Sequence, residues 1–259
     1  QLVAYGAQDQ LLTGNPVITF FKAIYRHHTN FSMESIRQTF NGTVGPGKRV
    51  VCNVSRHGDL ISDCWLEITN PNGNLDKCMI PRIIDNIELE IGGQRIDYHP
   101  GDWILKWMNL STSKERLETL YPNTEKIIHD DLSTPNDRLD DVMIYTKTRS
   151  SNTLYVPLQF FFCRNPGLAL PLIALQYHEV KINIHFKPST MYGAAMYPQD
   201  TDVNLFINYI YLDVDERRRF ATTSHQMLIE QVQYHQEFIK DTGEMNKKVT
   251  LNFNHPIKE

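Results

Sequence analysis

Short apolar runs separated by turn-forming residues recur along this chain and restrict it to folds built from many short strands. Asn, Gly and Pro, which favour turns, stand between the runs. No run alternates with a crossover helix, so a doubly wound parallel sheet is a poor fit. The pattern predicts an all-β protein, an antiparallel jelly-roll β-sandwich with short helices in its loops. The expected strands are Phe31–Phe40, Arg49–Val54, Leu60–Thr69, Ile83–Ile91, Gln94–Tyr98, Thr153–Cys163, Leu175–Phe186 and Val203–Leu212.

One turn and two helices can be placed more closely. Gly92-Gly93 separates two runs and predicts a two-residue hairpin turn, because glycine accepts the positive φ that such turns require. Trp103, Trp107 and Leu110 recur at helical spacing, and a second short helix is expected around residues 113–117. The polar segment 122–141 predicts an exposed excursion.

Residues 1–30 are expected to form an N-terminal arm and a short helix. Asn15 can cap that helix, and Pro16 suits its first position because the missing N–H would be unpaired there anyway. Such an arm has little to bury within its own chain, so it is expected to contact neighbouring subunits. The expected assembly interface comprises Leu2, Tyr5, Leu11, Leu12, Phe20, Phe21, Tyr25, Arg217, Arg218 and Arg219.

After the sandwich, expected over 31–212, the chain predicts a linker helix at 213–226. The acidic residues at its start suit the positive end of the helix dipole. Alternation from Leu228 to Tyr234 and the run Lys248–Phe253 predict two further strands without visible partners. Two strands alone are marginal in water, so 227–259 is interpreted as the truncated start of a second jelly roll.

Composition excludes several classes of function. The formal net charge is -4 and Lys and Arg do not cluster, whereas nucleic-acid binding needs many basic side chains against phosphates. No apolar run reaches the ~20 residues that span a bilayer. The four cysteines lack the short spacing of a zinc ribbon and are expected to be buried free thiols. No catalytic, cofactor-binding or metal site is predicted.

Some residues allow sharper alternatives. Glu88, Glu90 and Asp97 could form a carboxylate pair for glycoside cleavage, but solvent-facing strand positions explain them more simply. The acidic residues 213, 215 and 216 could hold calcium, although helix capping accounts for them. The arginines 217–219 are better explained by interdomain ion pairs than by nucleic acid. A Trp103–Trp107 platform would suit a carbohydrate-binding β-sandwich module, which is the alternative class of function.

Four stretches together resemble a known family. They are LVAYGAQDQLLTGNPVITFFKAIYRHHTNFS at the start, IDNIELEIGGQRID, YVPLQFFFCRNPGLALPLIALQYHEVKI, and YIYLDVDERRRFATTSHQMLIEQVQ with LNFNHPIKE at the end. In this order they are similar to the major capsid proteins of nucleocytoplasmic large DNA viruses. The resemblance implies a double jelly-roll subunit and a structural rather than enzymatic role.

The resemblance also implies partners and a location. Three copies would form a homotrimeric, pseudo-hexagonal capsomer that contacts neighbouring capsomers and minor capsid proteins and tiles an icosahedral shell. The protein would belong to the virion, after assembly in the host cytoplasm. It would lie near an internal viral membrane without inserting into it and would make no direct contact with nucleic acid. A minor capsid paralogue of the same fold is a second reading of the same resemblance.

Overall fold

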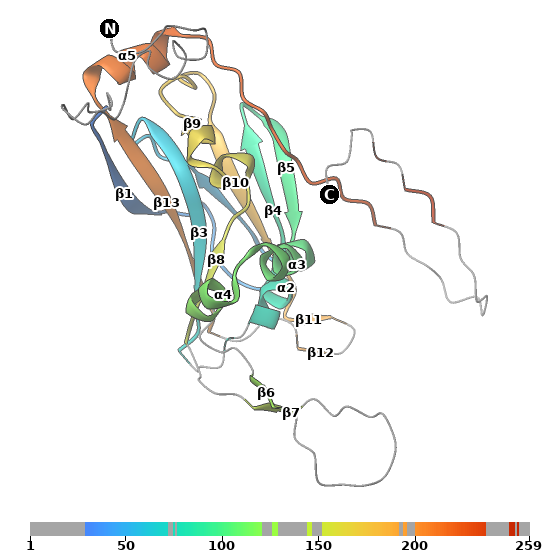
Figure 1. Ribbon diagram of the computed structural model, residues 1–259. Coiled ribbons are helices and arrows are strands. Elements are labelled where there is room, and N and C mark those ends of the chain that lie inside the picture. The colour runs from blue at the N-terminus through green and yellow to red at the C-terminus, as the bar shows by residue number, and fades with distance from the viewer. Residues whose placement is uncertain are drawn as a thin grey trace, which may run out of the picture.

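The computed structural model describes residues 29–71, 75, 77–120, 126–128, 144–146, 152–191, 194–195, 200–236, 249–251 and 253. Two antiparallel sheets face each other across one core (Figure 1). The first has the order β1 (Phe31–Gln38), β13 (Asp202–Leu212), β3 (Leu60–Thr69) and β8 (Thr153–Pro157), and the short β9 (Leu170–Pro171) also pairs with β3. The second has the order β2 (Arg49–Asn53), β10 (Val180–Phe186), β4 (Ile84–Ile91) and β5 (Gln94–Pro100).

The pairing of these strands defines the topology. β1 pairs with β13, β2 with β10, β3 with β8 and β4 with β5. These pairs are nested in the sequence, from the two ends of the domain toward its middle. This is a long hairpin rolled into a sandwich, which is the jelly-roll arrangement. The predicted fold class is confirmed.

Alternating side chains form the core between the sheets. In β3, for example, Cys64, Leu66 and Ile68 are buried while Asp63 is exposed and Trp65 and Glu67 are half-buried. Because successive side chains of a strand point to opposite faces, this alternation gives each strand one inward row. The rings of 160–162 and Tyr209 fill the interior between the rows.

The hairpin turn and the two helices were predicted correctly. Gly92 and Gly93 have φ values of 61° and 81° and join β4 to β5. The loop after β5 contains α3 (Gly101–Ser111) and α4 (Lys114–Leu120), and α3 buries Ile104 and Met108 against the core. The shorter helices are η1 (Lys77–Met79), α2 (Ile80–Ile83), η2 (Phe161–Cys163) and η3 (Pro166–Leu168). Two further pairs of short strands are β6 (Lys126–Ile128) with β7 (Ile144–Thr146) and β11 (Thr190–Met191) with β12 (Ala194–Ala195).

Two predicted strands were too long. The run from Thr153 stops at Pro157, which has no N–H to continue a ladder, and the next aromatic residues form η2. The run predicted from Leu175 becomes a strand only at Val180, because the backbone N–H groups of Leu175 and His178 close local turns.

The end of the chain also differs from the prediction. α5 (Val214–Thr222) forms where the linker helix was expected, but residues 224–236 have an extended backbone and belong to no sheet. We call this segment the strap. It runs alongside β5 (Figure 1), where its hydrogen bonds to Ile96 and Asp97 each join a backbone group to a side chain. Its apolar alternation therefore does not mark a paired strand in the described part of the chain.

Free thiols were expected, and the structure describes all four cysteines as free. Cys52 and Cys64 are buried and Cys163 is half-buried, whereas Cys78 is exposed, so the expectation of burial was wrong for Cys78. Burial raises the pKa of the Cys52 thiol to about 12 and also raises the pKa of the Cys64 thiol. Both remain protonated at neutral pH.

Candidate assembly surface

The outer face of the β1–β13–β3–β8 sheet carries several large apolar side chains. Trp65 of β3 and Phe206 of β13 stack with ring centroids 6.0 Å apart. Phe31 and Met33 of the edge strand β1 are 64% and 52% exposed, and they lie opposite Leu212 and Ile210. Large apolar side chains on an open sheet face are typical of a surface that binds another protein.

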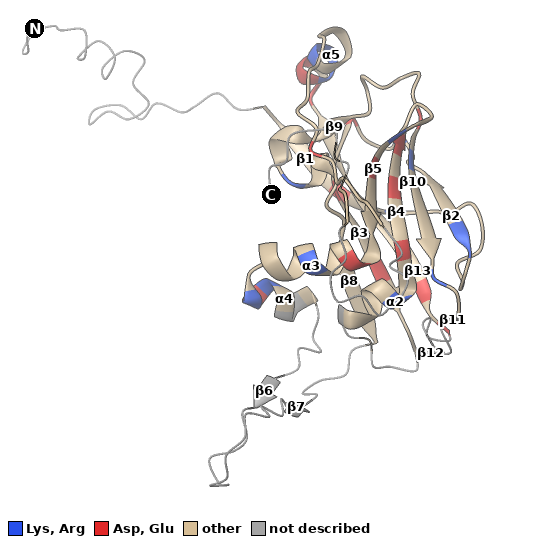
Figure 2. Ribbon diagram, turned by 90° about the vertical axis from the view of Figure 1, so that its right-hand side faces the viewer, with Lys and Arg blue, Asp and Glu red and all other residues tan. Residues whose placement is uncertain are grey.

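The outer face of the other sheet is charged. Figure 2 shows acidic and basic residues along β4 and β10. Glu88 lies 3.3 Å from Arg95 and 3.8 Å from His185, and Lys181 lies 3.0 Å from Glu179. The outer face of the β1–β13–β3–β8 sheet also carries the acidic side chains Asp63 and Glu67, so it combines apolar rings with acidic groups, whereas ion pairs occupy the outer face of the second sheet.

A groove of about 640 Å³ lies where α3 and α4 meet β3 and β8. The guanidinium of Arg164 lies 5.1 Å from the ring centroid of Trp107, in a cation–π contact within the groove lining. The Trp103 and Trp107 rings stack on each other at 5.6 Å, and Trp103 also stacks on His99 at 4.5 Å. These contacts within the chain use the ring faces that a sugar platform would need to leave open.

The α5 helix is attached to the sandwich through its first arginine. Asp213 caps the helix by accepting a hydrogen bond from the Val214 N–H at 2.7 Å, as the capping interpretation expected. Arg217 donates to both carboxylate oxygens of Asp59, at 2.9 and 3.0 Å, and Asp59 also accepts from the Leu212 N–H. Arg217 is therefore committed within its own chain, to the first sandwich.

The other two arginines differ from Arg217. Arg218 and Arg219 are exposed, and neither makes an ion pair with any described residue. Of the three basic residues expected at an interface, these two have no ion-pair partner in the described part of the chain. The remaining expected interface residues, Leu2, Tyr5, Leu11, Leu12, Phe20, Phe21 and Tyr25, lie outside the described residues, as does the helix expected after Asn15.

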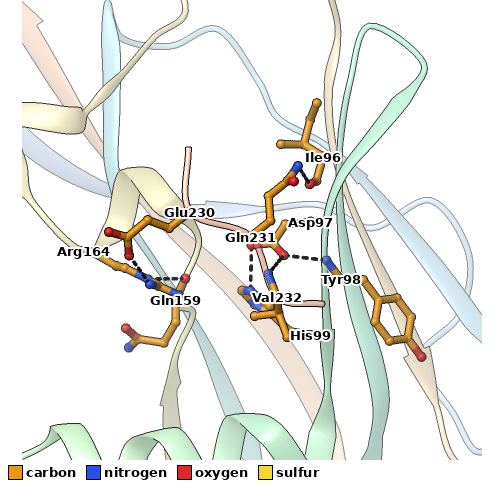
Figure 3. Close-up of polar contacts among 9 residues, drawn as sticks. All are labelled: Ile96, Asp97, Tyr98, His99, Gln159, Arg164, Glu230, Gln231 and Val232. Carbon is orange, nitrogen blue, oxygen red and sulfur yellow. Dashed lines mark hydrogen bonds and ion pairs between the residues drawn. The ribbon is translucent and has the colours of Figure 1, made fainter. Parts of the chain in front are cut away.

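The strap is joined to β5 around a buried carboxylate (Figure 3). The side chains of Asp97 and His99 have no exposed surface, and His99 Nε2 lies 2.9 Å from Asp97 Oδ2. Asp97 Oδ1 accepts from the Tyr98 N–H at 2.8 Å and from the Val232 N–H of the strap at 3.0 Å. The strap side chain Glu230 also lies 2.6 Å from Arg164.

The burial of Asp97 contradicts the prediction that it faces solvent. In a regular hairpin around the Gly92-Gly93 turn, pairing each residue of β4 with one residue of β5 would place Asp97 opposite Glu88, on the outer face. The register instead shifts, so that Arg95 lies opposite Glu90 but Asp97 lies opposite Leu89. Ile96 is thus the extra residue of a β-bulge, which moves Asp97 to the inward face. Glu88 and Glu90 remain half-buried on the outer row, with Glu88 in ion pairs.

The described part of the chain contains no cluster of three or more His, Cys, Asp and Glu side chains able to hold a metal ion. Among its helices none has the length and apolarity to cross a bilayer. The features that could bind another molecule are the side chains on the outer faces of the sheets and in the groove beside α3 and α4. The described strands and their pairing define a jelly-roll protein.

Comparison with known proteins identifies the family. Residues 19–213 match the family model described as the major capsid protein N-terminus, and residues 216–259 match the one described as the large eukaryotic DNA virus major capsid protein. The chain therefore belongs to the major capsid proteins of large eukaryotic DNA viruses.

Individual relatives agree with this assignment. The chain is 48% identical to the major capsid protein of Pyramimonas orientalis virus over its whole length, which covers 63% of that protein. It is 45% identical to capsid protein 1 of Acanthamoeba polyphaga mimivirus and covers 47% of it. The chain thus spans about half to two thirds of the length of these relatives.

Solved structures give the same result. A quasi-atomic model of the PBCV-1 virus capsid superposes with a TM-score of 0.62 and 37% identity, covering 83% of this chain and 50% of that one. The Faustovirus major capsid protein has a TM-score of 0.52 at 11% identity, covering 78% of this chain and 58% of that one, and shows the shared fold alone.

Proposed function

We propose that the protein is a structural subunit of a viral capsid, with no catalytic role, and that it acts by binding copies of itself. The observation that carries this proposal is the membership of the major capsid protein family over residues 19–213. The exposed Phe31 and Met33 of β1 and the stacked Trp65 and Phe206 on the same sheet support it, because apolar side chains on a surface are stabilised by burial against another subunit.

The proposed assembly is a homotrimer that forms a pseudo-hexagonal capsomer and tiles an icosahedral shell. The change of family model between residues 213 and 216 supports a boundary after the first jelly roll, with 227–259 as the start of a second. Two rolls in each of three chains would give six lobes, which suit a hexagonal lattice position. Contacts between capsomers can each be weak because many form together.

The proposed setting is the virion, after assembly in the host cytoplasm, with minor capsid proteins as further partners and an internal membrane nearby. A minor capsid paralogue remains the second candidate, and the match to mimivirus capsid protein 1 shows that relatives include numbered capsid proteins. The carbohydrate-binding alternative is disfavoured because Trp103 and Trp107 stack on each other and on neighbours within the chain.

The test is to purify the full-length protein and measure its mass in solution together with its appearance by electron microscopy. We expect trimers with a pseudo-hexagonal outline that associate into sheets or shells as concentration rises. A stable monomer at all concentrations would contradict the proposal, and binding of that monomer to a glycan array would favour the carbohydrate-binding class.

A further inference from the structure

The strap covers a position of β5 where the ladder is irregular. β5 is an edge strand, and Ile96 is the extra residue of its bulge. Since the extra residue of a bulge is left out of the ladder, its backbone groups need partners from elsewhere. The Ile96 carbonyl accepts a hydrogen bond from the Gln231 side chain of the strap (Figure 3).

The same bulge places Asp97 inside the sandwich, where a carboxylate is costly unless donors surround it. Three donors do so: the Tyr98 N–H, His99 Nε2 and the Val232 N–H. Only the Val232 N–H comes from outside β5. A buried acceptor of this kind distinguishes the register of the strap from a one-residue slip, because an extended chain moved by one residue would turn its N–H away and leave Oδ1 one donor short.

His99 holds the carboxylate in position for this contact. Its ring stacks on Trp103 at 4.5 Å and on Phe160 at 4.9 Å, so neighbours on α3 and in the core restrict its rotation. Nε2 lies against Oδ2 and thereby leaves Oδ1 to the backbone N–H groups of Tyr98 and Val232. His99 Nδ1 has no hydrogen-bond partner among the described residues, so the imidazole has a single polar contact there, to Asp97.

Strap residues on both sides of Val232 also contact the sandwich. Glu230 pairs with Arg164 at 2.6 Å, and the Tyr234 ring lies 5.6 Å from that of Tyr98. These two contacts are partly exposed, so water can replace them in part, whereas only a protein donor can satisfy the buried Asp97 oxygen. The buried carboxylate is therefore the contact that can fix the register.

We propose that Asp97 is a positioning residue: the bulge at Ile96 turns it inward so that it binds the Val232 N–H and fixes the course of the strap along β5. This inference rests on the proposed function for its significance, since the strap lies in the region that the second family model matches. In a capsid subunit it would set the direction in which the chain leaves the first jelly roll.

Amide hydrogen exchange on the full-length protein tests the proposal directly. In the unmodified protein the Val232 amide should exchange slowly, and Asp97→Ala should raise its rate by about tenfold or more while strands β3 and β13 stay protected. A Val232 amide that exchanges at the unprotected rate, or one unaffected by Asp97→Ala in a folded protein, would overturn the proposal.

A second pair of variants covers the case in which Asp97→Ala does not fold. Val232→Pro removes the N–H that Asp97 binds, whereas Leu228→Pro changes a strap residue that is 74% exposed and whose N–H makes no hydrogen bond with any described residue. We expect Val232→Pro to speed proteolysis within 224–236 several-fold while the sandwich stays folded, and Leu228→Pro to leave cleavage near that of the unmodified protein.

Equal cleavage of the two proline variants would refute the role of Asp97. These readings do not depend on assembly. A protein that stays monomeric but shows the expected exchange and cleavage would contradict the proposed capsid function and leave the positioning role intact.

Discussion

Gly92 and Gly93 form one turn but resist substitution for different reasons. Both have positive φ, which strains any residue with a β-branched side chain. A Cβ at Gly93 would have no atom within 4 Å, whereas a Cβ at Gly92 would lie 2.7 Å from His178 Nδ1. Backbone strain alone acts at Gly93, and a steric clash is added at Gly92.

We therefore expect Gly93→Val to lower the free energy of unfolding by about 1–3 kcal/mol, measured by urea denaturation. Gly93→Asn is the matched control and should cost clearly less, because Asn tolerates the left-handed region better than other residues. An unchanged denaturation midpoint for Gly93→Val would show that the turn does not need positive φ.

Buried thiols give the protein a pH dependence on the alkaline side. The pKa of Cys52 is about 12 in the folded chain, against an ordinary value of 9.0. The unfolded chain therefore loses this proton first. The stabilising contribution is complete below pH 9 and is lost as pH rises from 9 toward 12, at no more than about 1.4 kcal/mol per pH unit.

Denaturant unfolding at pH 8 and pH 10.5 measures this slope. Cys52→Ala should make it shallower than in the unmodified protein. Some slope should remain in Cys52→Ala because burial also raises the pKa values of Cys64 and Tyr209. An identical slope in Cys52→Ala and the unmodified protein would rule out the contribution of Cys52.

At this scale the sequence predicted what local chemistry determines and missed what the register determines. The Gly92-Gly93 turn followed from the φ values that such turns require. The burial of Asp97 could not follow, because it depends on one extra residue, Ile96, in a hairpin whose pattern is equally compatible with a regular ladder.

Among the helices, α5 has the clearest attachment to the sandwich. Its charge pattern predicted the helix and the cap, but three adjacent arginines gave no sign of which one would bind Asp59. Helical geometry separates them, since successive side chains point about 100° apart. Likewise the strand run from Thr153 was predicted too long because its aromatic residues suit η2 and a strand equally well.

Alanine substitutions of the three arginines should therefore differ. Arg217→Ala should lower the free energy of unfolding by about 1–2 kcal/mol, because it leaves the largely buried Asp59 carboxylate with fewer donors. Arg218→Ala and Arg219→Ala should change it by less than about 0.5 kcal/mol. Three equal losses in thermal or urea unfolding would mean that the Arg217–Asp59 pair does not stabilise the fold.

For the whole molecule, the number and kind of strands predicted a jelly roll, but the strand order could not be derived from apolar patterns. Order depends on contacts between β1 and β13 or β2 and β10, which lie far apart in the sequence. The strap shows the same limit, because its alternation resembles a strand although its hydrogen bonds to Ile96 and Asp97 each join a backbone group to a side chain.

Removal of residues 1–14 tests the separation of assembly from folding. We expect the shortened protein to keep the melting temperature of the sandwich and to lose most of its ability to form capsomers, because the arm sequence offers apolar side chains to neighbours. Calorimetry and solution mass measure the two properties separately. A lower melting temperature with normal assembly would place the arm's contribution within its own subunit instead.

The register of β1 and β13 has a mechanical consequence. Phe31, where the chain enters the sandwich, lies directly opposite Leu212, where it leaves. Tension between these two points would load the last rung of the antiparallel ladder and peel the strands apart one pair at a time. It would not shear all the rungs at once. The sandwich would thus yield readily to a pull on its two connections. That pull would act on β1 and β13 and would not load the other strands.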